Sequence, residues 1–187
     1  MMKFNRFVVV VLFATTSIFA QQKNAQETFW NQLKARCGQA YAGKMTTEPI
    51  PNDFADQALS MYVMSCSENE IKVPFYVGDD HSRTWVFTKT AQGIQLKHDH
   101  RLKDGSEDKI TQYGGTTTNT GGDQIQYFPA DQQTTDMLPA AAGNVWWVTI
   151  DDQGYTYNLR KVDNPNHFQV RFEWNQPLPV PNKPWGH

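Results

Sequence analysis

From residue 59 onward, hydrophobic and polar residues alternate along the chain in short segments. This period of two is typical of β-strands that turn one face to a core and the other to solvent. In the last segment, Phe168, Val170 and Phe172 are expected to face the interior. The pattern predicts strands at residues 59–64, 71–77, 84–90, 93–102, 109–113, 124–128, 144–150, 155–162 and 167–174.

Short turn sequences connect several of these segments. The Gly, Asp, Asn and Pro residues at 104–105, 151–154 and 164–166 are typical of tight turns between antiparallel neighbours. No stretch long enough for a crossover helix separates the strands, which excludes a βαβ arrangement. We therefore predict an all-β domain, an antiparallel up-and-down meander closed into a barrel. A two-sheet sandwich or jelly roll is the alternative.

One helix is predicted ahead of the strands. Asn24 can cap its N-terminus and Gly38 can end it. Two loops interrupt the alternation: a Gly- and Thr-rich loop at 114–123, and a longer one at 129–143 with a short helical turn near 135–137. The apolar face of the first helix consists of Phe29, Trp30, Leu33 and Cys37.

The first twenty residues have the composition of a secretion signal. Lys3 and Arg6 precede the apolar segment 7–13, and small residues lead to a cleavage point after Ala20. The apolar segment is too short to span a bilayer, and no stretch of eighteen or more apolar residues follows it. We expect a secreted or periplasmic protein without membrane insertion. Its parts are a signal peptide (1–20), a single barrel domain (21–176) and a Pro-rich tail (177–187).

The charge of the chain argues against polyanionic partners. Without Lys3 and Arg6, 15 basic residues remain against 19 acidic ones, a net charge of −4. Binding to nucleic acid or to an anionic membrane surface needs clustered Lys and Arg, so the charge argues against both functions. Aromatic residues make up 13% of the chain, enough for a sizeable core. Nothing in the pattern indicates an oligomeric state.

The only two cysteines, Cys37 and Cys66, both belong to the expected mature chain. In an oxidising compartment an even number of cysteines favours a disulfide. The bridge would close a loop of about 30 residues and stabilise the fold by roughly 3 kcal/mol. A redox pair or a metal site is the alternative, although the chain has no Cys-x-x-Cys sequence.

A helix that leads into an antiparallel meander, in a secreted chain of this size, resembles the calycin group of lipocalin-like barrels. Lipocalins open their first strand with Gly-x-Trp. The nearest sequence here is Gly38-Gln39-Ala40-Tyr41, in which the spacing and the ring differ. The family also packs an Arg near its last strand against that Trp, and Arg171 is the counterpart. The resemblance implies that the barrel carries a small, largely apolar or aromatic molecule.

His98 and His100 form the strongest candidate site. They lie two residues apart in segment 93–102 and share a face with Ile94, Leu96 and Leu102, so both imidazoles should point inward. There they can serve as polar contacts for a ligand in the barrel lumen. The expected ligand-binding residues are His98 and His100 together with the rings of Trp85, Tyr113 and Trp147.

A divalent metal ion is the alternative occupant of the histidine pair. Paired inward histidines on a barrel strand can bind Zn, Fe, Mn or Cu. The order Gly93, His98-x-His100, Asp104 resembles the first cupin motif, although the Gly spacing differs and no second motif follows. The candidates for a third ligand are Asp79, Asp80, His81 and His167.

Three functions therefore stay open for the chain. The first is a small-molecule-binding barrel, the second a cupin-like metal-dependent enzyme that uses His98 and His100, and the third a structural or protein-binding secreted domain. The chain contains no Gly-x-Ser-x-Gly and no His-Glu-x-x-His sequence, so other catalytic residues are not predicted.

Overall fold

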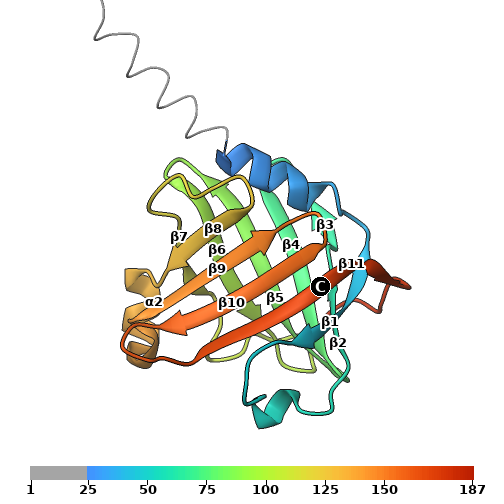
Figure 1. The fold of residues 1–187 in the computed structure, drawn as a ribbon. Coiled ribbons are helices and arrows are strands. Elements are labelled where there is room, and N and C mark those ends of the chain that lie inside the picture. Colours follow the sequence, from blue (N-terminus) through green and yellow to red (C-terminus); the bar gives the residue numbers. More distant parts are fainter. Residues whose placement is uncertain (1–24) are drawn as a thin grey trace, which may run out of the picture.

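A computed structural model describes residues 25–187, and both the expected cap Asn24 and the signal segment lie outside this range. The described chain forms one antiparallel sheet that curls into a barrel (Figure 1). Besides the helix at residues 25–34, it contains two short 3-10 turns and a second α-helix: η1 (Asn52–Phe54), α2 (Gln132–Met137) and η2 (Pro139–Ala141). The strands are β1 (Ala40–Met45), β2 (Leu59–Tyr62), β3 (Ser65–Cys66), β4 (Glu70–Val77), β5 (Asp80–Thr90), β6 (Gly93–His100), β7 (Tyr113–Thr116), β8 (Ile125–Pro129), β9 (Asn144–Ile150), β10 (Gly154–Lys161) and β11 (His167–Leu178).

The sheet confirms the predicted meander and its near closure. The strand order is β7-β6-β5-β4-β2-β1-β11-β10-β9-β8, with β3 paired to β4. The two ends of this path meet, because the Asp131 N–H that follows β8 donates to the Gly114 carbonyl of β7 over 3.0 Å. A Cβ on Gly115 would lie 1.7 Å from the Pro129 carbonyl oxygen, so glycine is required where the barrel closes.

Two strands that contain glycine, β1 and β7, differ from the sequence prediction. β7 occupies Tyr113–Thr116, whereas the pattern placed a strand at 109–113 and a loop at 114–123. β1 has no predicted counterpart, although it pairs with both β2 and β11. Small residues hide its alternation, and a Cβ on Gly43 would lie 2.5 Å from the Phe172 ring. In both strands glycine allows close packing and removes the hydrophobic signal.

Two other strands are longer than expected. β5 begins at Asp80, so residues 80–83 belong to the sheet rather than to a loop. β11 extends to Leu178, and Pro177 and Leu178 pair with Tyr41 and Ala40. Phe168, Val170 and Phe172 face the interior as predicted, with Val170 and Phe172 fully buried and Phe168 packed against the core.

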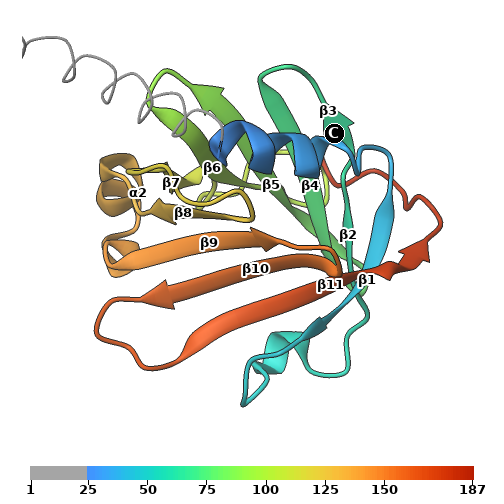
Figure 2. The same ribbon diagram turned by 45° about the horizontal axis from the view of Figure 1, so that its top comes forward.

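The helix at residues 25–34 closes one end of the barrel in both views (Figures 1 and 2). Phe29, Trp30 and Leu33 are at most 1% exposed and belong to the hydrophobic core. Just beyond the helix, a Cys37–Cys66 disulfide with Cα atoms 6.1 Å apart ties this end to β3, as the cysteine count predicted. No helix within residues 25–187 is both long and apolar enough to cross a membrane.

The outer face of β6 is covered, contrary to the expectation of a solvent-exposed polar face. Lys97 is 8% exposed and its Nζ bonds to Asp131 near α2 over 2.7 Å. Asp99 is 3% exposed because the C-terminal tail folds back and places His187 Nε2 3.1 Å from its carboxylate. Leu102 was expected inside, but β6 ends at His100 and Leu102 is 47% exposed.

The Arg171 contact implied by the lipocalin resemblance is absent. Arg171 lies on the outer face of β11, where its guanidinium bonds to the Asp151 carboxylate over 2.7 Å. The Tyr41 ring packs instead against Trp174, with centroids 4.7 Å apart. The guanidinium of Arg36 lies 4.5 Å from that Trp174 ring. The structure therefore supports the barrel architecture without the family's Arg–Trp arrangement.

Candidate functional site

The candidate site lies at the end of the barrel opposite the helix. β6 begins near the helix, where Thr117 bonds to both Gln26 (3.0 Å) and the Ile94 N–H (3.2 Å), and it ends at His100. The antiparallel register of β5 and β6 sets Arg83 opposite His100 and Trp85 opposite His98. Because residues opposite each other share a face, both pairs point into the barrel.

A cavity of about 130 Å³ lies between these side chains. Its walls are mainly aromatic, and its polar groups come from β5, β6 and β7. The Trp85 ring is nearly parallel to the Phe75 ring (centroids 5.0 Å apart) and to the Tyr157 ring (4.4 Å). The lining residues are Phe54, Phe75, Arg83, Thr84, Trp85, His98, His100, Tyr113, Tyr157, Leu159 and Phe168.

Both ring nitrogens of His98 are already engaged. Its Nδ1 lies 3.0 Å from the Tyr113 carbonyl oxygen and its Nε2 lies 2.7 Å from the Tyr157 hydroxyl. A carbonyl oxygen can only accept, so Nδ1–H donates and Nε2 accepts from Tyr157. Burial lowers the pKa of His98 to about 3. His98 is thus a neutral, rigidly held part of the wall.

His100 is held on one side only. Its Nε2 lies 3.0 Å from the Tyr113 hydroxyl, and its Nδ1 has no hydrogen-bond partner within residues 25–187. Burial, and then the nearby charge of Arg83, lower the pKa of His100. Burial raises the pKa of Tyr113 to about 12. At neutral pH both groups are uncharged, and His100 keeps one free nitrogen.

Arg83 supplies the charge at this end of the cavity. Its Nη1 bonds to the Asp80 carboxylate over 2.5 Å. Burial alone would raise the pKa of Asp80, but hydrogen bonds from Ser82 and the Arg83 charge lower it, so the pair stays ionised. The Nε and Nη2 groups of Arg83 have no partner among the described residues. Arg83 therefore has unused donors beside the cavity.

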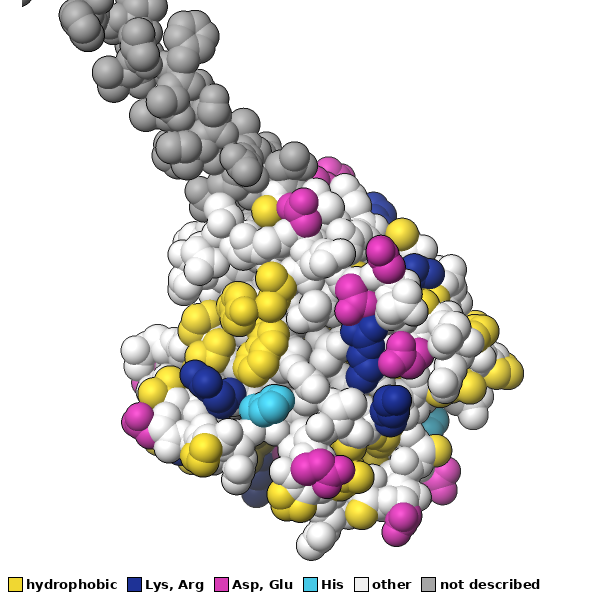
Figure 3. Space-filling view, viewed as in Figure 1, with side chains coloured by type: hydrophobic (Ala, Val, Ile, Leu, Met, Phe, Trp, Pro, Cys, Tyr) yellow, Lys and Arg dark blue, Asp and Glu magenta, His cyan; other side chains and the backbone are white. Residues whose placement is uncertain are grey.

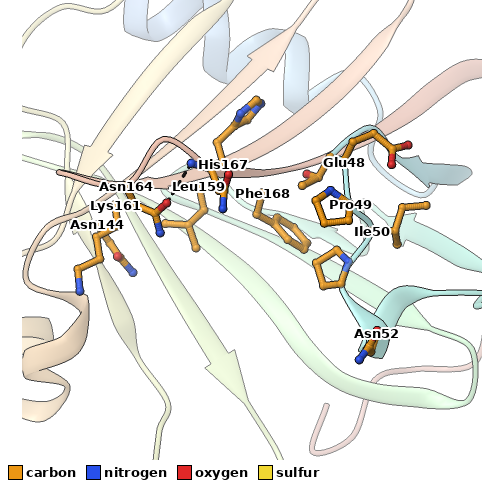
Figure 4. A pocket seen from close by; sticks show the side chains of 13 residues that line it. Glu48, Pro49, Ile50, Asn52, Asn144, Leu159, Lys161, Asn164, His167 and Phe168 are labelled. Atoms are coloured by element: carbon orange, nitrogen blue, oxygen red, sulfur yellow. Dashed lines mark hydrogen bonds between the residues drawn. The ribbon is translucent and has the colours of Figure 1, made fainter.

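A wider groove of about 550 Å³ adjoins the cavity at the barrel mouth (Figure 4). It lies between the loop 47–52 and the β10–β11 hairpin. Leu159 and Phe168 line both spaces, so the groove and the inner cavity are adjacent. Phe54 from η1 meets Phe168 across the boundary, with ring centroids 5.0 Å apart.

The structure brings four of the five predicted ligand-binding residues together: Trp85, His98, His100 and Tyr113. Trp147 lies instead on the outer face of β9, between Tyr127 (centroids 6.2 Å apart) and His167 (6.3 Å). Figure 3 shows hydrophobic side chains gathered over β8 and β9 on this face, next to a histidine. The inward ring is that of the adjacent Trp146, 5.2 Å from His98.

The alternation within β9 explains why Trp146, and not Trp147, faces the interior. Trp146 has the same parity as the buried Val148 and Ile150, whereas Trp147 does not.

The sequence pattern also did not identify Arg83 and Phe54 as site residues. Arg83 lies two residues before Trp85, so the same parity rule could have found it. Phe54 lies in a long loop whose path no local pattern predicts.

His81 and His167, two of the proposed third metal ligands, do not converge on the histidine pair, and the carboxylate of a third candidate, Asp80, bonds to Arg83. The β4–β5 pairing shifts between Phe75 and Val77, and His81 packs on the outer side between Tyr76 and Trp185. His167 lies against Trp147, and Asp104 bonds to Ser106 in the hairpin turn. Within residues 25–187, no group of three or more His, Cys, Asp or Glu side chains is arranged to hold a metal ion.

Comparison with protein family models, with curated proteins and with solved structures gives no significant match to this chain. The interpretation of the site therefore rests on its geometry.

Proposed function

We propose that this protein binds a small molecule with one aromatic ring in the cavity at the mouth of the barrel. The observation that carries the proposal is a space of about 130 Å³ inside a nearly closed barrel, walled by aromatic rings and edged by polar groups. A protein cavity of about 150 Å³ lined by apolar side chains accommodates benzene. The size of the space therefore suits a single ring.

The wall offers apolar contact and orientation to such a ring. Phe75, Trp85 and Tyr157 stack on one another and together form an apolar aromatic wall beside the space. The free Nδ1 of His100 and the unused donors of Arg83 can bind a polar substituent at one edge. The adjoining groove of about 550 Å³ leaves room for a larger polar part of the molecule.

We also propose that binding takes place outside the cytoplasm. The Cys37–Cys66 disulfide supports an oxidising compartment. Expression of the full chain in a bacterial host tests this part. The expected result is a disulfide-bonded product in the periplasm or medium whose N-terminus follows Ala20, and an uncleaved cytoplasmic product would contradict it.

Binding is tested by titrating the purified protein with phenol, benzyl alcohol and benzoate. Trp85 lines the cavity, so tryptophan fluorescence should change in a saturable way, and calorimetry should give the same affinity. His100→Gln should weaken binding because a polar contact is lost. His81→Gln is the matched control, since this histidine packs against Trp185 on the outside. The absence of saturable binding with all three probes would overturn the proposal.

A further inference from the structure

We propose that the cavity selects molecules that carry a carboxylate, and that Arg83 is the residue that determines this specificity. The inference rests on the proposed function, because it specifies the chemistry of the same site. It is derived from the charge of the cavity wall and from the position of the Arg83 guanidinium.

The wall of the cavity carries one full positive charge and no negative charge. Arg83 is the only Lys, Arg, Asp or Glu among the residues that line the space. His98 and His100 are neutral because burial lowers their pKa values, and Tyr113 and Tyr157 are neutral because burial raises theirs. Asp80 compensates part of this charge from outside the lining, so the preference for an anionic ligand comes mainly from the guanidinium donors that Asp80 leaves free.

The hydrogen-bond groups around Arg83 match a carboxylate. The guanidinium is a planar fork that binds a carboxylate through two parallel N–H donors. One nitrogen, Nη1, bonds to Asp80, while Nε and Nη2 have no partner among the described residues. His100 lies directly opposite Arg83 in the β5–β6 ladder and lines the same cavity. In the tautomer in which Nε2 accepts from the Tyr113 hydroxyl, the free Nδ1 carries a proton that it can donate to a carboxylate.

Asp80 holds the guanidinium without occupying the cavity. Its carboxylate bonds to Arg83 and to the Ser82 N–H at the start of β5, and Asp80 is not among the residues that line the space. A ligand carboxylate can therefore approach the remaining donors while Asp80 keeps Arg83 in place. An aromatic ring attached to that carboxylate would extend toward Phe75 and Trp85.

The test compares benzoate with benzyl alcohol, which have the same ring and differ in charge. Calorimetry at neutral pH and low salt should show benzoate binding about tenfold tighter to the unmodified protein. Arg83→Gln should remove this preference, with a loss of about tenfold for benzoate and little change for benzyl alcohol. Arg83→Lys keeps the charge without the fork and should retain part of the preference. The matched control is Arg160→Gln, an exposed β10 residue outside both spaces, which should behave as the unmodified protein.

The outcomes separate this inference from the proposed function. If both probes bind equally well, or if benzyl alcohol binds tighter, the carboxylate specificity is wrong and the binding function stands. If neither probe binds, the inference fails together with the proposed function. If Arg83→Gln binds benzoate as tightly as the unmodified protein, Arg83 does not determine the specificity. Circular dichroism and thermal unfolding establish that each variant is folded. If Arg83→Gln does not fold, the comparison is made with Arg83→Lys.

Discussion

The two ends of this barrel are built from different kinds of residues. At the helix end, Phe29, Trp30 and Leu33 are at most 1% exposed and fill the interior with apolar side chains. At the mouth, Arg83, His98 and His100 surround a space of about 130 Å³. A filled apolar interior stabilises a fold, whereas a space edged by polar groups does so less, because buried polar groups must first be satisfied. Under the proposed function, stability and recognition would be located at opposite ends of the barrel.

The two histidines show the same contrast over two residues. His98 uses both nitrogens on Tyr113 and Tyr157, so replacing it leaves partners unsatisfied inside the protein. His100 uses one nitrogen on Tyr113 and leaves the other free beside the cavity. A shared strand face thus holds one histidine that maintains the wall and one that is available to a ligand.

The largest loss of stability is expected from Trp30→Ala at the helix end. Removal of a fully buried Trp creates a cavity and should lower the free energy of unfolding by about 3–5 kcal/mol. Urea unfolding monitored by circular dichroism measures this change. Asn31→Ala, an exposed change in the same helix, should stay within about 0.5 kcal/mol. Equal effects of the two variants would show that the helix does not plug the barrel.

Loss of the disulfide should cause the second-largest loss of stability. The double variant Cys37→Ser, Cys66→Ser frees a loop with a sequence separation of 29 residues. The free energy of unfolding should fall by about 3 kcal/mol, because the unfolded chain gains entropy. Mass spectrometry after alkylation without reduction should find both thiols of the unmodified protein blocked. Two freely alkylated thiols would contradict the bridge.

The contrast between the ends also separates what the sequence predicts from what it does not. Period-two alternation located β9 at its observed bounds, Asn144–Ile150, and placed Phe168 and Phe172 inside. Alternation is visible only where a strand carries large apolar side chains, so the pattern does not predict β1 and displaces β7, where glycines allow two segments of chain to approach closely. Strand pairing in this protein depends both on alternating apolar side chains and on close approach at glycines. Only the alternation is visible in the hydropathy pattern.

The site was partly predictable for a similar reason. Alternation on a single strand was enough to place His98 inside and to pair it with His100 on one face. Arg83 comes from the neighbouring strand, and its position opposite His100 depends on a register that the sequence does not specify. The coverage of Asp99 by His187 depends on a tail that is distant in sequence. Contacts between elements therefore account for most of what was missed.

His98 should make the free energy of unfolding depend on pH, by less than the changes expected for the Trp30 and disulfide variants. The pKa of this imidazole is about 3 in the folded protein and 6.5 in the unfolded chain, so between these values the unfolded state binds more protons. Stability should therefore fall as the pH drops below about 6.5, by about 2 kcal/mol between pH 7 and pH 5. Urea unfolding at both pH values measures the change. His98→Gln lacks this titration, and an unchanged pH dependence in that variant would show that His98 is not buried as a neutral ring.

The smallest effect on stability, and the sharpest test of the contrast between the two histidines, is expected from His100→Gln. Its side chain gives up a hydrogen bond to Tyr113 at a half-buried position, so the free energy of unfolding should fall by less than about 1 kcal/mol. Affinity for benzoate should fall about fivefold, because the free Nδ1 beside Arg83 is lost. His98→Gln at pH 7 should show the reverse pattern, with a larger loss of stability from the unsatisfied Tyr157 hydroxyl and Tyr113 carbonyl. If thermal unfolding instead finds both variants equally destabilised and calorimetry finds benzoate binding unchanged, His100 belongs to the wall as His98 does. Benzoate binding at the mouth would then depend on Arg83 and the aromatic rings, and the two histidines would share one structural role.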